Sequence, residues 1–178
     1  MPEPIAEFIA DVHAAEDTTL TGKLDFLEAL VPVLARWGAP DKGQALRQWL
    51  TLVAVDHEVL GLVARLRQAG YACVLATNQQ PHRARFMADD LGYRTKFDHC
   101  FFSCEMGVAK PDPRYFHAIL KTLNLAPDQA LFLDDKPQNI AGARSVGIQA
   151  ECFANAKDGR AHAALTKILA RFGVVCQT

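Results

Sequence analysis

The chain has 178 residues, half of them apolar, and its 19 basic and 20 acidic residues give a net charge of -1. This length suits one domain with a small appended subdomain, and the near-neutral charge gives no support for a nucleic-acid partner or a membrane surface. The sequence shows neither an apolar run of membrane-spanning length nor the basic and apolar regions of a signal peptide. We therefore expect no membrane partner and a cytoplasmic location.

The N-terminal segment has the periodicity of helices. Its apolar residues recur at helical spacing in three successive stretches, and none of it alternates as a strand would. Thr21-Gly22 separates the first stretch from the second, and Gly38-Ala39-Pro40-Asp41 separates the second from the third. We predict an all-helical segment over residues 1–55, followed by a core of a different kind over residues 56–178.

From Asp56 onward, helices and strands are expected to alternate. Asp56 is a candidate N-cap for a helix that ends at Gly70, where a left-handed residue costs least. Apolar runs of strand length follow, with helical periodicity after each of them, at residues 71–76, 100–103, 131–133 and 148–153. This alternation predicts an α/β fold, with a three-layer, Rossmann-like parallel sheet that carries helices on both faces.

Two adjacent carboxylates follow the apolar run Leu131-Phe132-Leu133. They would lie at the C-terminal tip of a strand, which is where open parallel sheets bind ligands. Because Asp134 and Asp135 repel each other, a nearby cation helps both to stay ionised, and Mg2+ is the natural hard, oxygen-ligated ion. The alternative is an acidic turn in which one of the two carboxylates only caps the next helix.

Two other expected loops carry polar groups of interest. Thr77 and Asn78 end the first strand and place a hydroxyl and an amide before a helix whose free N–H groups would attract a phosphate oxygen. Lys110 precedes Pro111-Asp112-Pro113, and a turn stiffened by two prolines could aim its ammonium group inward. The alternatives are an ordinary capping pair and a solvated loop lysine.

In combination, these motifs resemble the haloacid dehalogenase-like (HAD) hydrolase superfamily, and the N-terminal helices look like that family's helical cap. The resemblance implies that Thr77 and Asn78 bind phosphate, that Lys110 stabilises charge on the nucleophile and the phosphoryl group, and that Mg2+ is held by two acids. It favours a metal-dependent phosphatase of small phosphorylated metabolites, with Lys110 and Thr77 as catalytic residues and Asp134 and Asp135 as metal ligands. The residues that carry it are Thr77-Asn78, Gly107-x-x-Lys110-Pro111-Asp112-Pro113, and Asp134-Asp135-x-x-x-Asn139 with Gly142-Ala143.

The first motif of that family is missing from the 178 residues. Family members open with an apolar strand that ends in D-x-D, whose first Asp forms an aspartyl-phosphate and whose second acts as acid and base. The most similar stretch has an alanine at the position of the nucleophile. It is Ala15-Glu16-Asp17-Thr18-Thr19-Leu20. We therefore expect the central strand of the sheet to be missing and the chain to be inactive as written. Either the sequence begins downstream of the true start, or a non-catalytic relative fills the gap with another segment or a partner.

Three functions follow from these patterns. The first is a hydrolase of the HAD type that works through an aspartyl-phosphate. The second is a pseudo-enzyme that binds phosphate, metal or a protein partner without turnover. The third is a phosphoacceptor module of the response-regulator type, but in that class the acids precede the Thr and the Lys, whereas here they come last. The residues name neither the substrate nor the oligomeric state.

Overall fold

The computed structural model describes residues 3–39, 41–153 and 161–174. Its helices and short strands confirm the predicted α/β class. The chain divides into two compact units, one made of residues 1–55, 76–94 and 100–109, the other of residues 56–75, 95–99 and 110–178. The division into a cap and a core after residue 55 remains a prediction. Among the described residues, no helix is long and apolar enough to cross a membrane.

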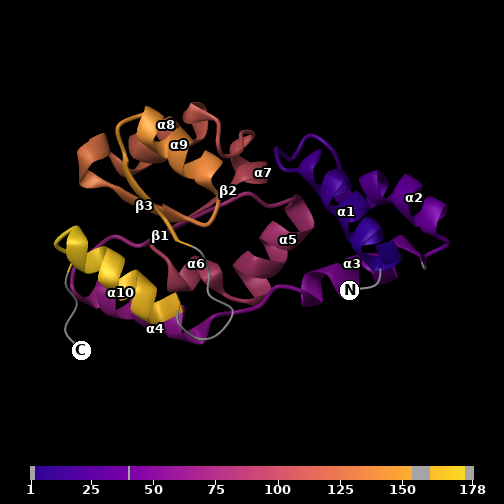
Figure 1. Ribbon diagram of the computed structural model, residues 1–178, viewed down its shortest axis with the longest axis horizontal. Helices are drawn as coiled ribbons and strands as arrows, with labels where there is room; N and C mark the ends of the chain where they lie inside the picture. The colour runs from indigo at the N-terminus through magenta and orange to yellow at the C-terminus, as the bar shows by residue number, and fades with distance from the viewer. Residues whose placement is uncertain (1–2, 40, 154–160, 175–178) are drawn as a thin grey trace. The chain divides into compact units, whose positions relative to one another are not determined.

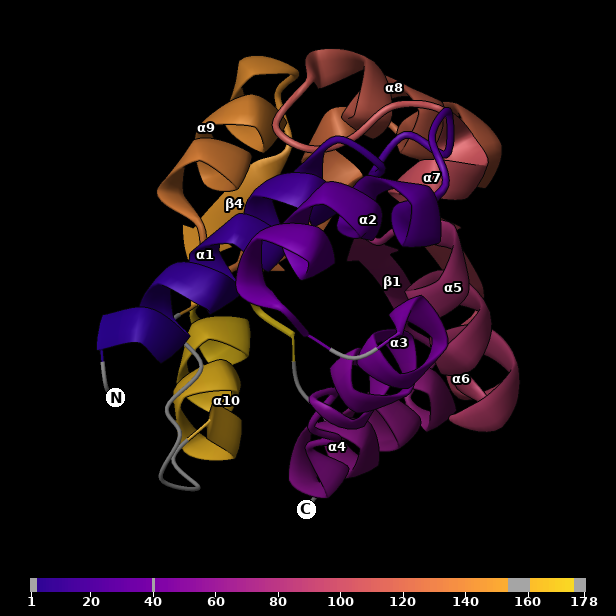
Figure 2. The same ribbon diagram turned by 90° about the vertical axis from the view of Figure 1, so that its right-hand side faces the viewer.

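Three helices open the first unit, as the periodicity predicted. They are α1 (Glu3–Asp17), α2 (Phe26–Trp37) and α3 (Lys42–Thr51), and α2 packs against both of the others (Figure 2). The start of α2 is fixed by Asp25, whose carboxylate accepts hydrogen bonds from two backbone N–H groups of the first turn. Its end is fixed by Gly38, which has the positive φ of 56° that a left-handed C-cap requires.

An apolar core holds these helices together. Phe26 is completely buried, and the removal of a side chain of this size from water contributes about 2 to 3 kcal/mol. The indole of Trp49 joins α3 to the same core. The buried members of the cluster are Val12, Phe26, Leu30, Leu34 and Trp49.

Strand β1 (Val74–Thr77) pairs with β2 (His99–Phe102) in a two-stranded sheet. Both strands lie where the sequence predicted them, with ends displaced by one to three residues. Tyr71 to Cys73 stay outside β1, where the backbone N–H of Cys73 donates to the carboxylate of Asp98. The remaining short helical elements are α5 (Pro81–Arg85), the π-helical turn η1 (Phe86–Asp90), α6 (Tyr93–Lys96) and α7 (Ser103–Met106).

The second unit is built around β3 (Leu131–Asp134) and β4 (Gln149–Cys152). These strands are parallel, and Asp134 lies opposite Cys152 at their C-terminal ends. Asp56 caps the first helix of the unit by accepting from the backbone N–H of Val59, as predicted. The helices are α4 (His57–Gln68), α8 (Pro113–Leu123), α9 (Pro137–Ser145) and α10 (Ala161–Arg171), with the 3-10 turn η2 (Pro127–Gln129) before β3.

Helices cover both faces of this parallel pair. The ring of Phe132 contacts Phe116 of α8, with 5.2 Å between the centroids, whereas Leu133 packs in a cluster with α4 and α10. Successive side chains of a strand point to opposite faces, so α8 and the α4–α10 pair lie on different sides of β3 (Figure 1). In the described residues β3 pairs with β4, and β1 pairs with β2. That a central strand is missing between the two pairs remains a prediction.

Gly142 explains how closely α9 approaches the turn that carries Lys110. A Cβ atom at this position would collide with the backbone carbonyl of Pro111 and lie 3.0 Å from the ring of Phe116. Only a residue without a side chain fits there. Gly142 of the sequence motif therefore allows α9 to pack directly against this turn.

Candidate functional site

Lys110 and Asp134 form a buried ion pair in the second unit. Lys110 Nζ lies 2.6 Å from Asp134 Oδ2, and the two side chains are only 7% and 6% exposed. The ammonium group also lies 5.3 Å from the centre of the Phe132 ring, on the strand that delivers Asp134. Lys110 is therefore not a solvated loop lysine, because its charge meets the carboxylate at the tip of β3.

Three donors converge on the carboxylate of Asp134. Besides Lys110, its Oδ1 accepts from the backbone N–H of Lys136 and from Nδ2 of Asn139, each at 2.9 Å. Burial alone would raise the pKa of Asp134, but the hydrogen bond and charge of Lys110, with these two donors, hold it below its ordinary value. A carboxylate has about four lone-pair positions. With three of them in use, one remains on Oδ2.

Asp135 differs from its neighbour because it is exposed to solvent. Lys136, not either acid, occupies the N-cap of α9, so the alternative that one of the carboxylates only caps this helix is wrong. Within the described ranges, no group of three or more His, Cys, Asp and Glu side chains is placed to hold a metal. Two carboxylates nevertheless fit Mg2+, which commonly takes one or two of them and completes its shell with water and phosphate oxygens.

Thr77 and Asn78 belong to the first unit. The helix α5 begins only at Pro81, and its first N–H groups, those of His82 and Arg83, donate to the side-chain oxygen of Gln80. The prediction that free N–H groups attract an anion here is therefore wrong, because Gln80 already uses them. That Thr77 and Asn78 bind the same phosphate as Lys110 remains a prediction.

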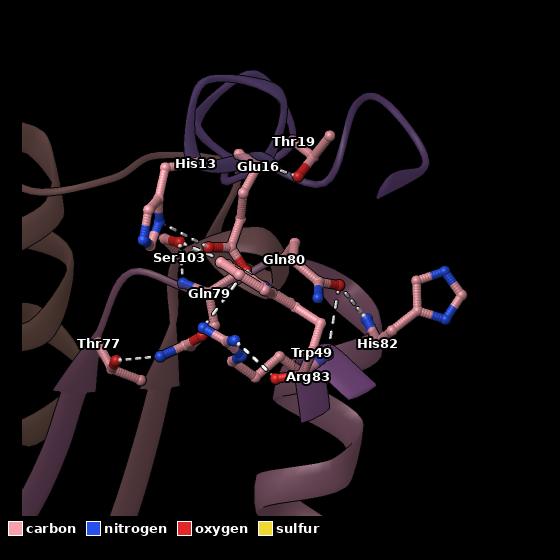
Figure 3. A network of polar contacts seen from close by, with 10 residues as sticks. All are labelled: His13, Glu16, Thr19, Trp49, Thr77, Gln79, Gln80, His82, Arg83 and Ser103. Atoms are coloured by element: carbon pink, nitrogen blue, oxygen red, sulfur yellow. Dashed lines mark hydrogen bonds and ion pairs between the residues drawn. The ribbon is translucent and has the colours of Figure 1, made fainter. Parts of the chain in front are cut away.

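A second buried ion pair, between Glu16 and Arg83, lies in the first unit (Figure 3). Arg83 Nη1 is 3.4 Å from Glu16 Oε1, and the indole N–H of Trp49 donates to the same oxygen at 2.9 Å. The guanidinium lies over the Trp49 ring, 5.0 Å from its centre, and donates to the Trp49 carbonyl. Burial lowers the pKa of Arg83, and the charge of Glu16 opposes this shift. These contacts tie α1, α3 and α5 together.

Sequence reasoning gave no role to several of these residues. Asn139 stood in the motif, and its place in the first turn of α9, within reach of Asp134, was the available signal. Arg83 carried no signal, because its partners Glu16 and Trp49 lie far away in the sequence.

Comparison with known proteins finds one matching family model and several similar proteins. The model of the family described as haloacid dehalogenase-like hydrolase matches residues 1–147. A phosphoserine phosphatase from Thermus thermophilus is 35% identical over 118 residues, which are 64% of this chain and 47% of that protein. A glyceraldehyde 3-phosphate phosphatase from Pyrococcus furiosus is 32% identical over 95 residues, 50% of this chain and 38% of that protein. The chain thus spans less than half the length of these two relatives.

Solved structures share the fold. A protein described as a predicted HAD-like family hydrolase from Porphyromonas gingivalis aligns with a TM-score of 0.71 at 23% identity, over 85% of this chain and 76% of that one. A HAD family enzyme from Bacteroides thetaiotaomicron, in complex with magnesium and inorganic phosphate, aligns with a TM-score of 0.68 at 21% identity, over 79% and 74%. At these identities the likeness establishes the architecture alone.

Proposed function

The chain belongs to the haloacid dehalogenase-like hydrolase family, and on this premise we propose that it supplies the phosphate-binding and metal-binding residues of a Mg2+-dependent phosphatase. The observation that carries the proposal is the buried pair of Lys110 and Asp134 beside the exposed Asp135. A cation, an acid with one open lone pair and a second acid together suit a phosphoryl group and a divalent ion. The phosphatase relatives support a small phosphorylated molecule as the substrate.

Each residue has a distinct role in this proposal. Lys110 would neutralise negative charge on the nucleophile and on the phosphoryl oxygens, held in place by Asp134. Thr77 and Asn78 would donate hydrogen bonds to a phosphoryl oxygen. Asp134 and Asp135 would hold Mg2+, which when bound supplies Lewis-acid polarisation of the phosphoryl group.

Asn139 would act through Asp134. It is buried, and its amide donates to the carboxylate oxygen that Lys110 does not contact. Donors of this kind fix the orientation of a ligating carboxylate, so its remaining lone pair points in one direction. We propose Asn139 as the residue that keeps Asp134 aligned for the metal.

The 178 residues contain no D-x-D sequence. In this proposal the nucleophilic Asp would therefore have to come from another segment. We propose that hydrolysis proceeds through an aspartyl-phosphate once an apolar strand ending in D-x-D is supplied, and that the 178 residues alone bind without turnover. The competing possibility is a non-catalytic relative that binds phosphate, metal or a protein partner.

A fusion experiment separates the two. An apolar strand that ends in D-x-D, the motif that the resemblance to the family implies, would be joined to Met1 and the product assayed with p-nitrophenyl phosphate. We expect hydrolysis that requires Mg2+ and stops with EDTA. The matched control replaces the first Asp of the grafted motif with Asn and should be inactive. A folded fusion that binds Mg2+ and shows no hydrolysis would favour the non-catalytic relative.

A further inference from the structure

We infer that Gln79 is a positioning residue that directs the hydroxyl proton of Thr77 toward bound phosphate. The inference rests on the proposed function, in which Thr77 binds the phosphoryl group. Nε2 of Gln79 donates to Oγ1 of Thr77 at 3.1 Å, and Figure 3 shows the two side chains pointing toward each other. Both residues, and the serine that anchors Gln79, lie in the first unit.

The backbone of Gln79 is fixed by a single buried hydroxyl. The N–H of Gln79 donates to Ser103 Oγ at 3.0 Å, and the same hydroxyl donates to the carbonyl of Gln79 at 3.3 Å. Ser103 is completely buried, so a displacement of Gln79 would leave a buried polar group without its partner. Ser103 thus holds Gln79, and Gln79 in turn holds the Thr77 hydroxyl.

The direction of the hydrogen bond between Gln79 and Thr77 decides whether the Thr77 hydroxyl can donate to phosphate. A threonine hydroxyl has one proton and two lone pairs, whereas the NH2 group of a glutamine can only donate. The bond from Gln79 therefore occupies a lone pair of Thr77 and leaves its proton for another acceptor. Phosphoryl oxygens are acceptors, and donors oriented in advance bind them without further reorganisation. Gln79 would thereby keep Thr77 in the orientation that donates to phosphate.

A double-mutant cycle on the 178-residue chain tests this. The dissociation constant of inorganic phosphate would be measured by calorimetry at saturating Mg2+ for the wild type, Gln79→Met, Thr77→Val and the double variant. Gln79→Met keeps the length of the side chain and removes the amide, and we expect about fivefold weaker binding, the size of one neutral hydrogen bond. In Thr77→Val, which has no hydroxyl, Gln79→Met should add nothing. In Thr77→Ser, which keeps the hydroxyl, it should again weaken binding about fivefold.

Controls separate positioning from a general structural effect. Gln48→Met makes the same chemical change at an exposed position of α3 and should leave phosphate binding unchanged. Gln79→Asn, whose shorter amide does not reach Thr77, gives a second measurement if Gln79→Met does not fold. An equal loss in the presence and absence of the Thr77 hydroxyl would overturn the inference. Unchanged or tighter binding by Gln79→Met would do the same, because the amide would then be accepting the Thr77 proton.

The same measurements distinguish a failure of the proposed function from a failure of the role inferred for Gln79. If the wild type does not bind phosphate, the proposed function fails and this inference fails with it. If the wild type binds phosphate and Thr77→Val weakens binding, the proposed function stands whatever Gln79→Met does. Only the dependence of the Gln79→Met effect on the Thr77 hydroxyl then decides the role of Gln79.

Discussion

The two units each bury an acid against a base, and the surroundings of the two pairs differ. At the tip of β3, Asp134 receives three donors, keeps one lone pair on Oδ2 and stands beside the exposed Asp135. Between α1 and α5, Glu16 and Arg83 are enclosed by Trp49, which donates to the acid and covers the guanidinium. The first pair has a second, solvent-exposed carboxylate next to it in the chain, whereas the indole of Trp49 contacts both members of the second pair.

Under the proposed function, only one of the two buried charge pairs belongs to a ligand site, so burial of a charge pair does not by itself mark such a site. Both pairs are strongly desolvated, with side-chain exposures of 7% and 6% in one and 15% and 9% in the other. What distinguishes the Asp134 pair is its place at the C-terminal end of a parallel strand and its second, exposed acid. The proposed ligand site is therefore at the Asp134 pair, and we expect a structural role for the Glu16 pair.

The largest expected effect is on stability, through the Glu16 pair. Glu16→Ala leaves the buried guanidinium of Arg83 without its counter-charge and should lower the free energy of unfolding by about 3 kcal/mol, measured by urea denaturation. Glu28→Ala, which breaks an exposed ion pair with Lys42, is the matched control and should leave the midpoint nearly unchanged. Equal shifts in both variants would mean that the Glu16 pair has no special structural role.

A smaller effect is expected at the Asp134 pair, where a substitution should strengthen Mg2+ binding. Lys110→Met removes a cation that competes for Oδ2 of Asp134, so Mg2+ should bind about tenfold more tightly by calorimetry. Phosphate should bind more weakly in the same variant, because its counter-charge is gone. Lys121→Met, at an exposed position of α8, is the control and should change neither affinity. Unchanged Mg2+ affinity in Lys110→Met would place the metal away from Asp134.

Short sequence patterns predicted much of the fold and one of the two buried ion pairs, the one between Lys110 and Asp134, in part. The cap at Asp56, the strand that ends in Asp134 and the turn that aims Lys110 inward follow from short patterns in which the partners of each residue are close by or its chemistry is distinctive. The Glu16 pair could not be predicted in this way, because three segments must fold together before Arg83 meets Glu16. The N–H groups of α5 were predicted wrongly for a related reason, since nothing in the sequence shows that Gln80 turns back to accept from them.

The smallest expected effect is a change in the acid sensitivity of folding. The pKa of Asp134 is lower in the folded chain than its ordinary value of 3.8, so the carboxylate stabilises the fold above that value, and this contribution is lost as the pH falls through the folded pKa. Asp134→Asn should therefore flatten the decline in unfolding free energy below about pH 4, measured by urea titration at several pH values.

Asp98 supplies the matched control for this measurement. Hydrogen bonds from the Cys73 backbone and from Arg67 lower its pKa as well, so Asp98→Asn should also flatten the acid limb. Only Asp134→Asn should in addition weaken Mg2+ binding, because Asp98 lies outside the proposed metal site. If both variants changed acid stability and neither changed Mg2+ affinity, the Asp134 pair would be structural like the Glu16 pair, and the distinction between the two would disappear.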